Sequence, residues 1–213
     1  MPFSSPLIEC PLCKESSPLA PQVEHKYQRC NQCALWFLLP QFRLDPTTEK
    51  SRYLLHTHDA NDEGYKQYLL PLYSSLIQKL TQESKGLDYG SGPDSLLGQM
   101  LKEQLFSISS YDPYFIPDET VLSQSYDFVF SSEVCEHFYD PAFEFQRLRT
   151  LVKPNGILGI MTQMYDNLDF ASWHYRKDPT HVVFYCKETF NWIASHLGWN
   201  EVSFIDKKTI LLR

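Results

Sequence analysis

A glycine-rich turn between an apolar stretch and a helix pattern most constrains the fold of this chain. Residues 86–101 read Gly-Leu-Asp-Tyr-Gly-Ser-Gly-Pro-Asp-Ser-Leu-Leu-Gly-Gln-Met-Leu. The pattern predicts the end of a buried strand, a tight turn at Gly90 and Gly92, and a helix whose first turn holds Pro93. In an open α/β sheet, a nucleotide-like ligand binds at such a strand-to-helix turn.

The residues around this turn do not match the common phosphate-binding patterns. A dinucleotide fingerprint would have a third glycine where Ser95 stands, and a phosphate-binding loop would end in a Gly-Lys-Ser or Gly-Lys-Thr sequence. Asp88 and Asp94 flank the turn, and their negative charge would repel a pyrophosphate. S-adenosylmethionine carries an amino group and a sulfonium but no phosphate, so it suits an acidic turn. An ordinary glycine turn in a core is the alternative.

Length and charge limit the classes of function. A chain of 213 residues has room for one catalytic α/β domain and a small appendage. The formal net charge of −7 disfavours, without excluding, a nucleic-acid partner, which usually requires a basic face. Residues 1–50 contain five acidic and five basic residues, so the excess acid lies in residues 51–213. No apolar run suits a membrane span and no signal-peptide pattern is present, so we expect a cytoplasmic protein without a membrane partner.

Four cysteines near the N-terminus form two Cys-x-x-Cys pairs separated by sixteen residues: Cys10, Cys13, Cys30 and Cys33. This spacing is typical of structural zinc sites, because each pair can occupy two corners of a tetrahedron. Four thiolates leave no open coordination position for catalysis. We therefore expect a zinc ribbon over residues 1–45 that orients the chain or recruits a protein partner.

A polar stretch and a helix pattern separate the cysteines from the glycine turn. Apolar residues recur at helical spacing from Gly64 to Gln82, and Pro71 predicts a kink or a division into two helices. We expect residues 46–85 to form a linker and helices that cap the cofactor site. Candidate covering side chains are Tyr53, His56 and Tyr65. Ordinary surface or core packing is the alternative for each of them.

A second predicted strand, over residues 105–111, ends at Asp112 and Pro113. An acidic residue at this place, about twenty residues past the first turn, typically binds a ribose diol. The alternative is that Asp-Pro simply opens a turn. Only residues 113–125 separate Asp112 from the next strand, so the third-strand region of a doubly wound sheet must be trimmed.

The remaining chain continues the alternation of strands and helices. We expect a strand over 126–130, a helix over 142–151, a turn over 153–156, a strand over 157–161, an aromatic loop over 162–185, a helix over 187–197, and an antiparallel hairpin of 201–205 with 209–212.

Taken together, these segments resemble the class I S-adenosylmethionine-dependent methyltransferases, and more narrowly a bacterial branch with an N-terminal four-cysteine zinc module. The matching segments are 87–93, 111–113, 126–129, 133–137, 151–156 and 173–181. The resemblance implies a Rossmann-like α/β domain over residues 86–213, with a mostly parallel sheet and an antiparallel C-terminal hairpin strand. It implies methyl transfer from S-adenosylmethionine to an unidentified acceptor, for which the acidic charge and aromatic loop favour a small molecule.

The resemblance also implies roles for matching positions. The methionine and ribose of the cofactor would be lined by Asp88, Gly90, Ser91 and Gly92. Asp112 would hold the ribose hydroxyls, and Pro113 would lie against the adenine. Ser132, Glu133 and His137 would border the sulfonium. Asp94 departs from the family, whose turn usually has a third glycine, and the trimmed segment 113–125 leaves the adenine-amine contact unassigned.

Three histidines are candidate general bases for an in-line methyl displacement: His137, His174 and His181. Helix capping by His137 and a core position for His181 are the alternatives. A second metal at His174, Asp178 and His181 is disfavoured, because their spacing does not place them on one helical face. Two other functions stay open: an RNA methyltransferase that uses the ribbon to bind RNA, and a non-catalytic cofactor-binding protein.

Overall fold

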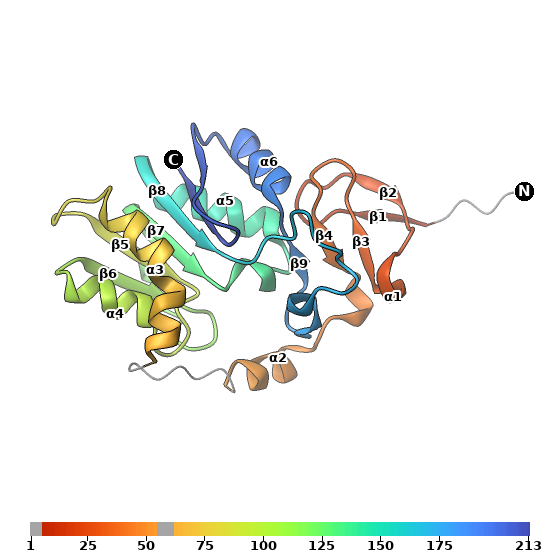
Figure 1. Cartoon of the computed structure of the whole chain (residues 1–213), viewed down its shortest axis with the longest axis horizontal. Helices are drawn as coiled ribbons and strands as arrows, with labels where there is room; N and C mark the ends of the chain where they lie inside the picture. The colour runs from red at the N-terminus through yellow and green to blue at the C-terminus, as the bar shows by residue number, and fades with distance from the viewer. Residues whose placement is uncertain (1–5, 55–61) are drawn as a thin grey trace, which may run out of the picture.

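The computed structural model describes residues 6–54 and 62–213, and its centre is a six-stranded sheet in the order β10-β11-β8-β7-β5-β6 (Figure 1). Four strands are parallel: β5 (Lys85–Tyr89), β6 (Ser107–Tyr111), β7 (Tyr126–Ser132) and β8 (Val152–Met161). The C-terminal hairpin of β10 (Val202–Phe204) and β11 (Thr209–Leu212) adds antiparallel strands beside β8. The predicted mostly parallel sheet with an antiparallel C-terminal strand is confirmed.

The predicted trimming next to β6 is also confirmed. Between β6 and β7 the chain forms a short 3-10 helix, η2 (Glu119–Ser123), and no additional sheet strand, so β6 is the edge of the sheet. Thirteen residues cannot supply a strand with two flanking helices, which is why counting residues was sufficient here.

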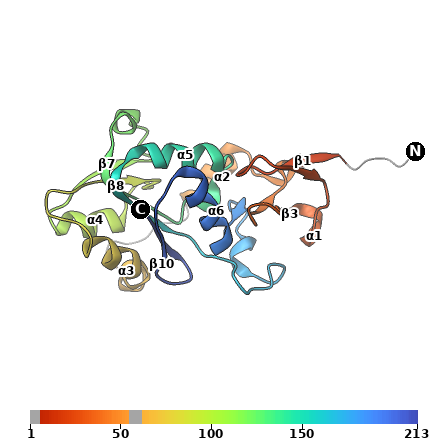
Figure 2. The same ribbon diagram turned by 90° about the horizontal axis from the view of Figure 1, so that it is seen from above.

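Two pairs of helices cover the two faces of the sheet (Figure 2). Leucines of α3 (Glu63–Ile77) and α4 (Leu96–Glu103) pack with Phe128 and Phe130 on one face, and α5 (Pro141–Leu151) and α6 (Lys187–Leu197) pack on the other. Gly159 of β8 permits the close approach of α3, because a Cβ there would lie 2.8 Å from Leu72 Cδ1. Across the described ranges, no helix is long and apolar enough to cross a membrane.

Two predicted breaks are wrong. The predicted division at Pro71 is wrong, because buried Leu69, Leu72 and Leu76 hold the turns on both sides of the proline against the same sheet face, within the single helix α3. The alternative of a kink at Pro71 stays a prediction. This helix ends at Ile77, before the predicted end at Gln82. Residues 153–156 form no turn between elements but an irregular part of β8, where the register against β7 shifts.

The N-terminal module consists of two short hairpins, and a strand from the C-terminal part of the chain joins the second. The elements are β1 (Leu7–Glu9), β2 (Ser16–Pro18), α1 (Val23–Lys26), β3 (Tyr27–Arg29) and β4 (Trp36–Leu38). β4 pairs with β9 (Val183–Phe184), which gives a three-stranded sheet in the order β3-β4-β9 (Figure 1). The aromatic ring of Trp36 stacks on that of Phe170, with centroids 4.4 Å apart. Side chains of the module therefore share one hydrophobic core with α5 and α6.

A short connection leads from this module to α3. It contains the 3-10 helix η1 (Pro40–Phe42) and helix α2 (Pro46–Tyr53), whose first turn is capped by the Asp45 carboxylate. Figure 1 shows α2 below the sheet, in orange.

Candidate functional site

The loop after β5 is held by a serine cap and by hydrogen bonds to the next strand. Ser95 Oγ accepts a hydrogen bond from the N–H of Gly98 at 3.0 Å, so α4 begins at Leu96. The predicted place of Pro93 in the first helical turn is therefore wrong, because the cap lies two residues further on. The N–H groups of Gly90 and Ser91 donate to the carbonyl oxygen of Tyr111 at 2.8 and 3.1 Å.

The two glycines of this loop have different surroundings. Both have positive φ, +80° at Gly90 and +62° at Gly92, where other residues are strained. A Cβ on Gly90 would lie 2.4 Å from Val134 Cγ1, whereas a Cβ on Gly92 would have no atom within 4 Å. Gly90 is thus packed against the segment after β7, and the backbone at Gly92 borders open space.

Replacing Gly90 with alanine is expected to lower the free energy of unfolding by about 2–4 kcal/mol, from strain at positive φ and overpacking against Val134. Gly92→Ala is the matched control: it incurs the backbone strain alone, about 1 kcal/mol. Urea unfolding of both variants measures the difference. Equal destabilisation by the two substitutions would contradict the close contact of Gly90 with Val134.

Asp112 links the loop to the end of β6. This residue is only 8% exposed, and its carboxylate accepts hydrogen bonds from the N–H groups of Gly92 at 2.9 Å, Tyr114 at 2.8 Å and Phe115 at 3.0 Å. The neighbouring Pro113 is exposed. Asp112 is therefore anchored beside the open backbone of Gly92, and its predicted contact with a ribose remains a prediction.

Asp88 stands at the end of β5 beneath the loop. Burial raises the pKa of this carboxyl to about 7; the Ser95 hydroxyl and the charge of Lys102 lower it, and the charge of Asp112 raises it. The carboxyl is therefore partly protonated near neutral pH in the absence of a ligand.

This raised pKa predicts a pH dependence of stability. Between the ordinary pKa of 3.8 and the folded value of about 7, the folded protein binds more protons than the unfolded chain. The protonated Asp88 carboxyl therefore stabilises the folded protein fully below the ordinary pKa. This contribution to the free energy of unfolding, about 2–4 kcal/mol, is lost as the pH rises through the folded pKa. Urea unfolding of the unliganded protein between about pH 5 and pH 7.5 should show the decline. Asp88→Asn should make the decline shallower, and a decline of the same steepness in both proteins would refute the assignment.

The segment after β7 supplies two glutamates. Glu133 has a positive φ of 54°, and its carboxylate accepts hydrogen bonds from the hydroxyls of Tyr68 at 2.9 Å and Tyr175 at 3.2 Å. Glu136 follows in the 3-10 helix η3 (Cys135–His137) and also accepts from Tyr175. Burial raises the pKa of both carboxyls, and the charge of Glu136 raises that of Glu133 further. One hydroxyl proton can serve only one of these carboxylates at a time.

The structure brings together two of the three predicted histidines. The ring centroids of His137 and His181 are 4.9 Å apart. Since carbonyl oxygens only accept, His137 Nδ1–H donates to Thr180 O at 2.9 Å and His181 Nδ1–H donates to Tyr175 O at 2.7 Å. Burial lowers the pKa of His137, which favours its neutral form. His174 lies apart from this pair, exposed at the start of η4 (His174–Lys177).

Helix α2 borders the same region. The ring of Tyr53 lies edge-on to that of His137, with centroids 5.2 Å apart. The buried carboxylate of Glu49 accepts hydrogen bonds from the hydroxyls of Tyr53 at 2.6 Å, Tyr114 at 3.1 Å and Tyr139 at 3.2 Å. These bonds hold α2 against both the loop after β6 and the segment after η3.

Of the other residues predicted to contact the cofactor, the structure describes Tyr65 and Ser132 but not His56. The half-buried ring of Tyr65 stacks on Tyr68 with centroids 6.0 Å apart, and His56 lies outside the described residues. The buried hydroxyl of Ser132 has no hydrogen-bond partner among the residues that the structure describes. It could therefore receive a bond from a ligand.

Glu49 and Glu136 were not predicted from the sequence as members of this region. Glu136 stands directly before the candidate base His137, and that adjacency was a usable signal. No local sequence pattern indicated Glu49, because its three tyrosine partners are spread over residues 53–139.

The four N-terminal cysteines form a second cluster. Their sulfur atoms all lie within 4.8 Å of one another, with Cys10 Sγ 3.6 Å from Cys33 Sγ and Cys13 Sγ 3.4 Å from Cys30 Sγ. Tetrahedral zinc with bonds of about 2.3 Å would place its thiolates about 3.8 Å apart. The arrangement therefore fits zinc.

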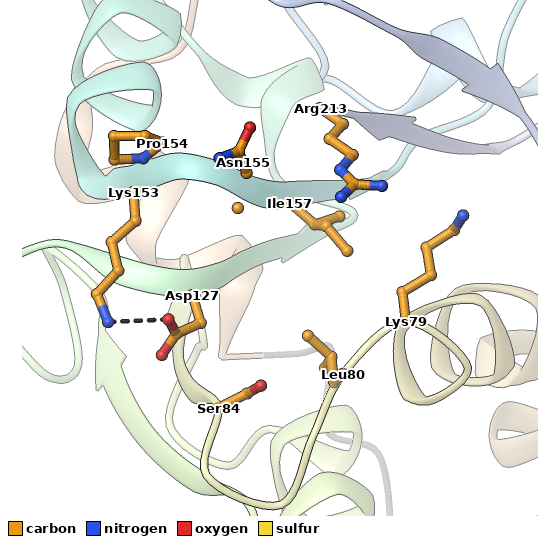
Figure 3. Close-up of a pocket in the computed structure, with 10 residues that line it drawn as sticks. Lys79, Leu80, Ser84, Asp127, Lys153, Pro154, Asn155, Ile157 and Arg213 are labelled. Carbon is orange, nitrogen blue, oxygen red and sulfur yellow. Dashed lines mark hydrogen bonds and ion pairs between the residues drawn. The ribbon is translucent and has the colours of Figure 1, made fainter.

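A pocket of about 290 Å³ lies elsewhere, between Lys79, Ser84, Asp127, Lys153 and Arg213 (Figure 3). These residues lie beside the amino ends of β5, β7 and β8, whereas open α/β sheets bind ligands at the carboxyl ends. Asp127 is already paired with Lys153 at 2.9 Å. The pocket is thus separate from the candidate site at Gly92, Asp112 and His137.

Comparisons with solved structures agree with the fold. Human N-acetylserotonin methyltransferase in complex with S-adenosylmethionine has a TM-score of 0.55 at 12% identity, covering 78% of this chain and 56% of its own. An O-methyltransferase family protein from Burkholderia thailandensis has a TM-score of 0.50 at 14% identity, covering 77% and 61%. The 1,6-didemethyltoxoflavin-N1-methyltransferase of the same organism has a TM-score of 0.50 at 13% identity, covering 88% and 97%. This chain therefore spans less than two thirds of the length of the first two.

Comparisons of sequence identify the family. No curated protein sequence gives a significant match. A family model described as a methyltransferase domain matches residues 61–203, about two thirds of the chain. The chain therefore belongs to the methyltransferase domain family, as its sequence motifs predicted.

Proposed function

We propose that this protein transfers a methyl group from S-adenosylmethionine to a small-molecule acceptor. The family match carries the proposal, and the loop after β5 supports it. There the open backbone of Gly92 lies beside the anchored carboxylate of Asp112. The complexes of human N-acetylserotonin methyltransferase with S-adenosylmethionine and of the 1,6-didemethyltoxoflavin-N1-methyltransferase with 1,6-didemethyltoxoflavin and S-adenosylhomocysteine are consistent with it.

The chemistry of the loop fits this cofactor. Asp88 and Asp112 provide carboxyl groups at the ends of adjacent strands, which suit hydroxyl and ammonium groups better than phosphates. The buried Ser132 hydroxyl could receive a further hydrogen bond. The residues that would hold the cofactor are thus Asp88, Gly90, Ser91, Gly92 and Asp112, with Ser132, Glu133 and His137 on its reactive side.

When bound, S-adenosylmethionine supplies an electrophilic methyl group. The residues of this chain would position the acceptor for in-line attack, exclude water and take up a proton. The Nδ1 protons of His137 and His181 point to backbone carbonyls, so in the neutral rings Nε2 is the basic atom. The exposed His174 is the weakest of the three candidate bases.

We also propose a structural zinc ion at the four cysteines. The close sulfur atoms support this ion. Because β4 of the module pairs with β9, the ion would stabilise a contact between the module and the C-terminal part of the chain. The module would hold the loop of residues 165–182, which carries Tyr175, Thr180 and His181. Recruitment of a protein partner by the module stays a separate prediction.

Calorimetry with S-adenosylhomocysteine tests the proposed function. We expect one molecule to bind per chain, whereas ATP and NAD, which carry phosphates, should not bind at the acidic loop. Absence of S-adenosylhomocysteine binding to folded protein would contradict the proposal. Salt-sensitive retention of RNA by the same protein would instead favour an RNA acceptor.

A further inference from the structure

We propose that Glu136, His137 and His181 form a binding site for a divalent transition-metal cation, separate from the four cysteines. One carboxylate oxygen and one nitrogen from each ring lie within 4.8 Å of one another. Two imidazoles and one carboxylate are a recognised ligand set for such cations, with positions left open for water or substrate.

The fold brings these residues together from two distant segments. η3 places Glu136 and His137 next to each other shortly after β7, and His181 lies two residues before the start of β9. The N–H of Val182 donates to the carbonyl oxygen of Glu136 at 2.8 Å, which fixes the two segments against each other. A strand pairing and a backbone hydrogen bond therefore hold the three ligands in place.

Both histidine rings are oriented as metal ligands usually are. A metal-binding histidine typically donates its second ring N–H to a carbonyl or carboxylate, which turns the other nitrogen toward the ion. His137 does so to Thr180 O, and His181 does so to Tyr175 O. The Nε2 atoms are then the coordinating atoms, and His137 Nε2 already lies 4.0 Å from Glu136 Oε1.

The carboxylate provides the second, independent observation. Glu136 is 0% exposed, and its Oε2 accepts no hydrogen bond from any described residue. Its Oε1 accepts a hydrogen bond from the Tyr175 hydroxyl. A buried oxygen without a partner is costly, and a cation held by both carboxylate oxygens would remove that cost.

The ligand types indicate which cations would bind. Imidazole and carboxylate suit manganese, iron, cobalt and zinc, whereas magnesium and calcium prefer oxygen atoms alone and copper(I) prefers sulfur. With a cation bound, His137 and His181 act as ligands in place of the base role considered above. If the proposed methyl transfer holds, an oxygen of the acceptor would take an open position; binding of the cation does not depend on this.

Manganese(II) is the probe that separates this site from the cysteines, because soft thiolates select zinc. We would add Mn²⁺ to the zinc-loaded protein and follow free Mn²⁺ by electron paramagnetic resonance. One Mn²⁺ should bind per chain while the zinc content stays constant. Glu136→Gln and His181→Asn should each weaken binding at least tenfold.

His174→Ala is the matched control, since this exposed histidine lies on the same loop outside the cluster; it should bind Mn²⁺ as the unmodified protein does. Thermal melting verifies folding of each variant, and His137→Gln replaces any variant that does not fold. No Mn²⁺ binding, or unchanged binding in the folded Glu136 and His181 variants, would overturn the site. S-adenosylhomocysteine calorimetry on the same samples tests the proposed function separately, so either can fail alone.

Discussion

Replacing Cys10 with serine is expected to remove the zinc and to lower the melting temperature by roughly 10 °C or more, because the folding of small zinc modules depends on the metal. The effect should extend beyond the module. β4 pairs with β9, and the Leu38 N–H donates to Val182 O at 2.8 Å, one residue after His181. Loss of the module should therefore loosen the segment that carries His181.

Metal analysis and differential scanning calorimetry measure this result. Cys186→Ser is the matched control: this buried cysteine lies outside the cluster, beside the Thr189 hydroxyl at 3.4 Å, where a serine can cap α6 equally well. It should retain the zinc and the melting temperature. A Cys10→Ser protein with a full equivalent of zinc and an unchanged melting profile would refute the structural zinc site.

Replacing Asp112 with alanine is expected to weaken S-adenosylhomocysteine binding by more than tenfold. Loss of a charged acceptor for a ribose diol corresponds to roughly 1.5–3 kcal/mol. The substitution also releases the N–H groups of Gly92, Tyr114 and Phe115, so the loop itself should become less ordered. Both effects act in the same direction.

Asp118→Ala separates a general effect on this loop from the loss of the diol contact. Asp118 is exposed and caps only η2, through the N–H of Thr120 at 3.0 Å. Calorimetry should find cofactor affinity unchanged in this control. Unchanged affinity in a folded Asp112→Ala protein would show that Asp112 does not contact the ribose.

Local patterns were sufficient to predict much of the fold. The glycine turn and the helix over 187–197 depend on neighbouring residues, as does the spacing within each cysteine pair. The trimmed region after Asp112 followed from residue counting. The division of a helix at Pro71 was predicted wrongly, because packing of Leu69, Leu72 and Leu76 on the sheet outweighs the local cost of a proline.

Contacts between distant segments could not be predicted in this way. The pairing of β4 with β9 joins residues 36–37 to residues 183–184, and no local pattern in either segment specifies the other. The same holds for Glu49 with Tyr139 and for Glu136 with His181. The placement of Asp88 and Asp112 at adjacent strand ends could therefore be predicted from local patterns, whereas the approach of Glu49 and Glu136 to residues of other segments could not.

A crystal structure grown with S-adenosylhomocysteine tests the central claim most directly. Density for the ligand should lie at the carboxyl ends of β5 and β6, against Gly92, with its ribose hydroxyls on Asp112. Density only in the pocket between Lys79, Lys153 and Arg213, or a loop closed by its own side chains, would contradict it.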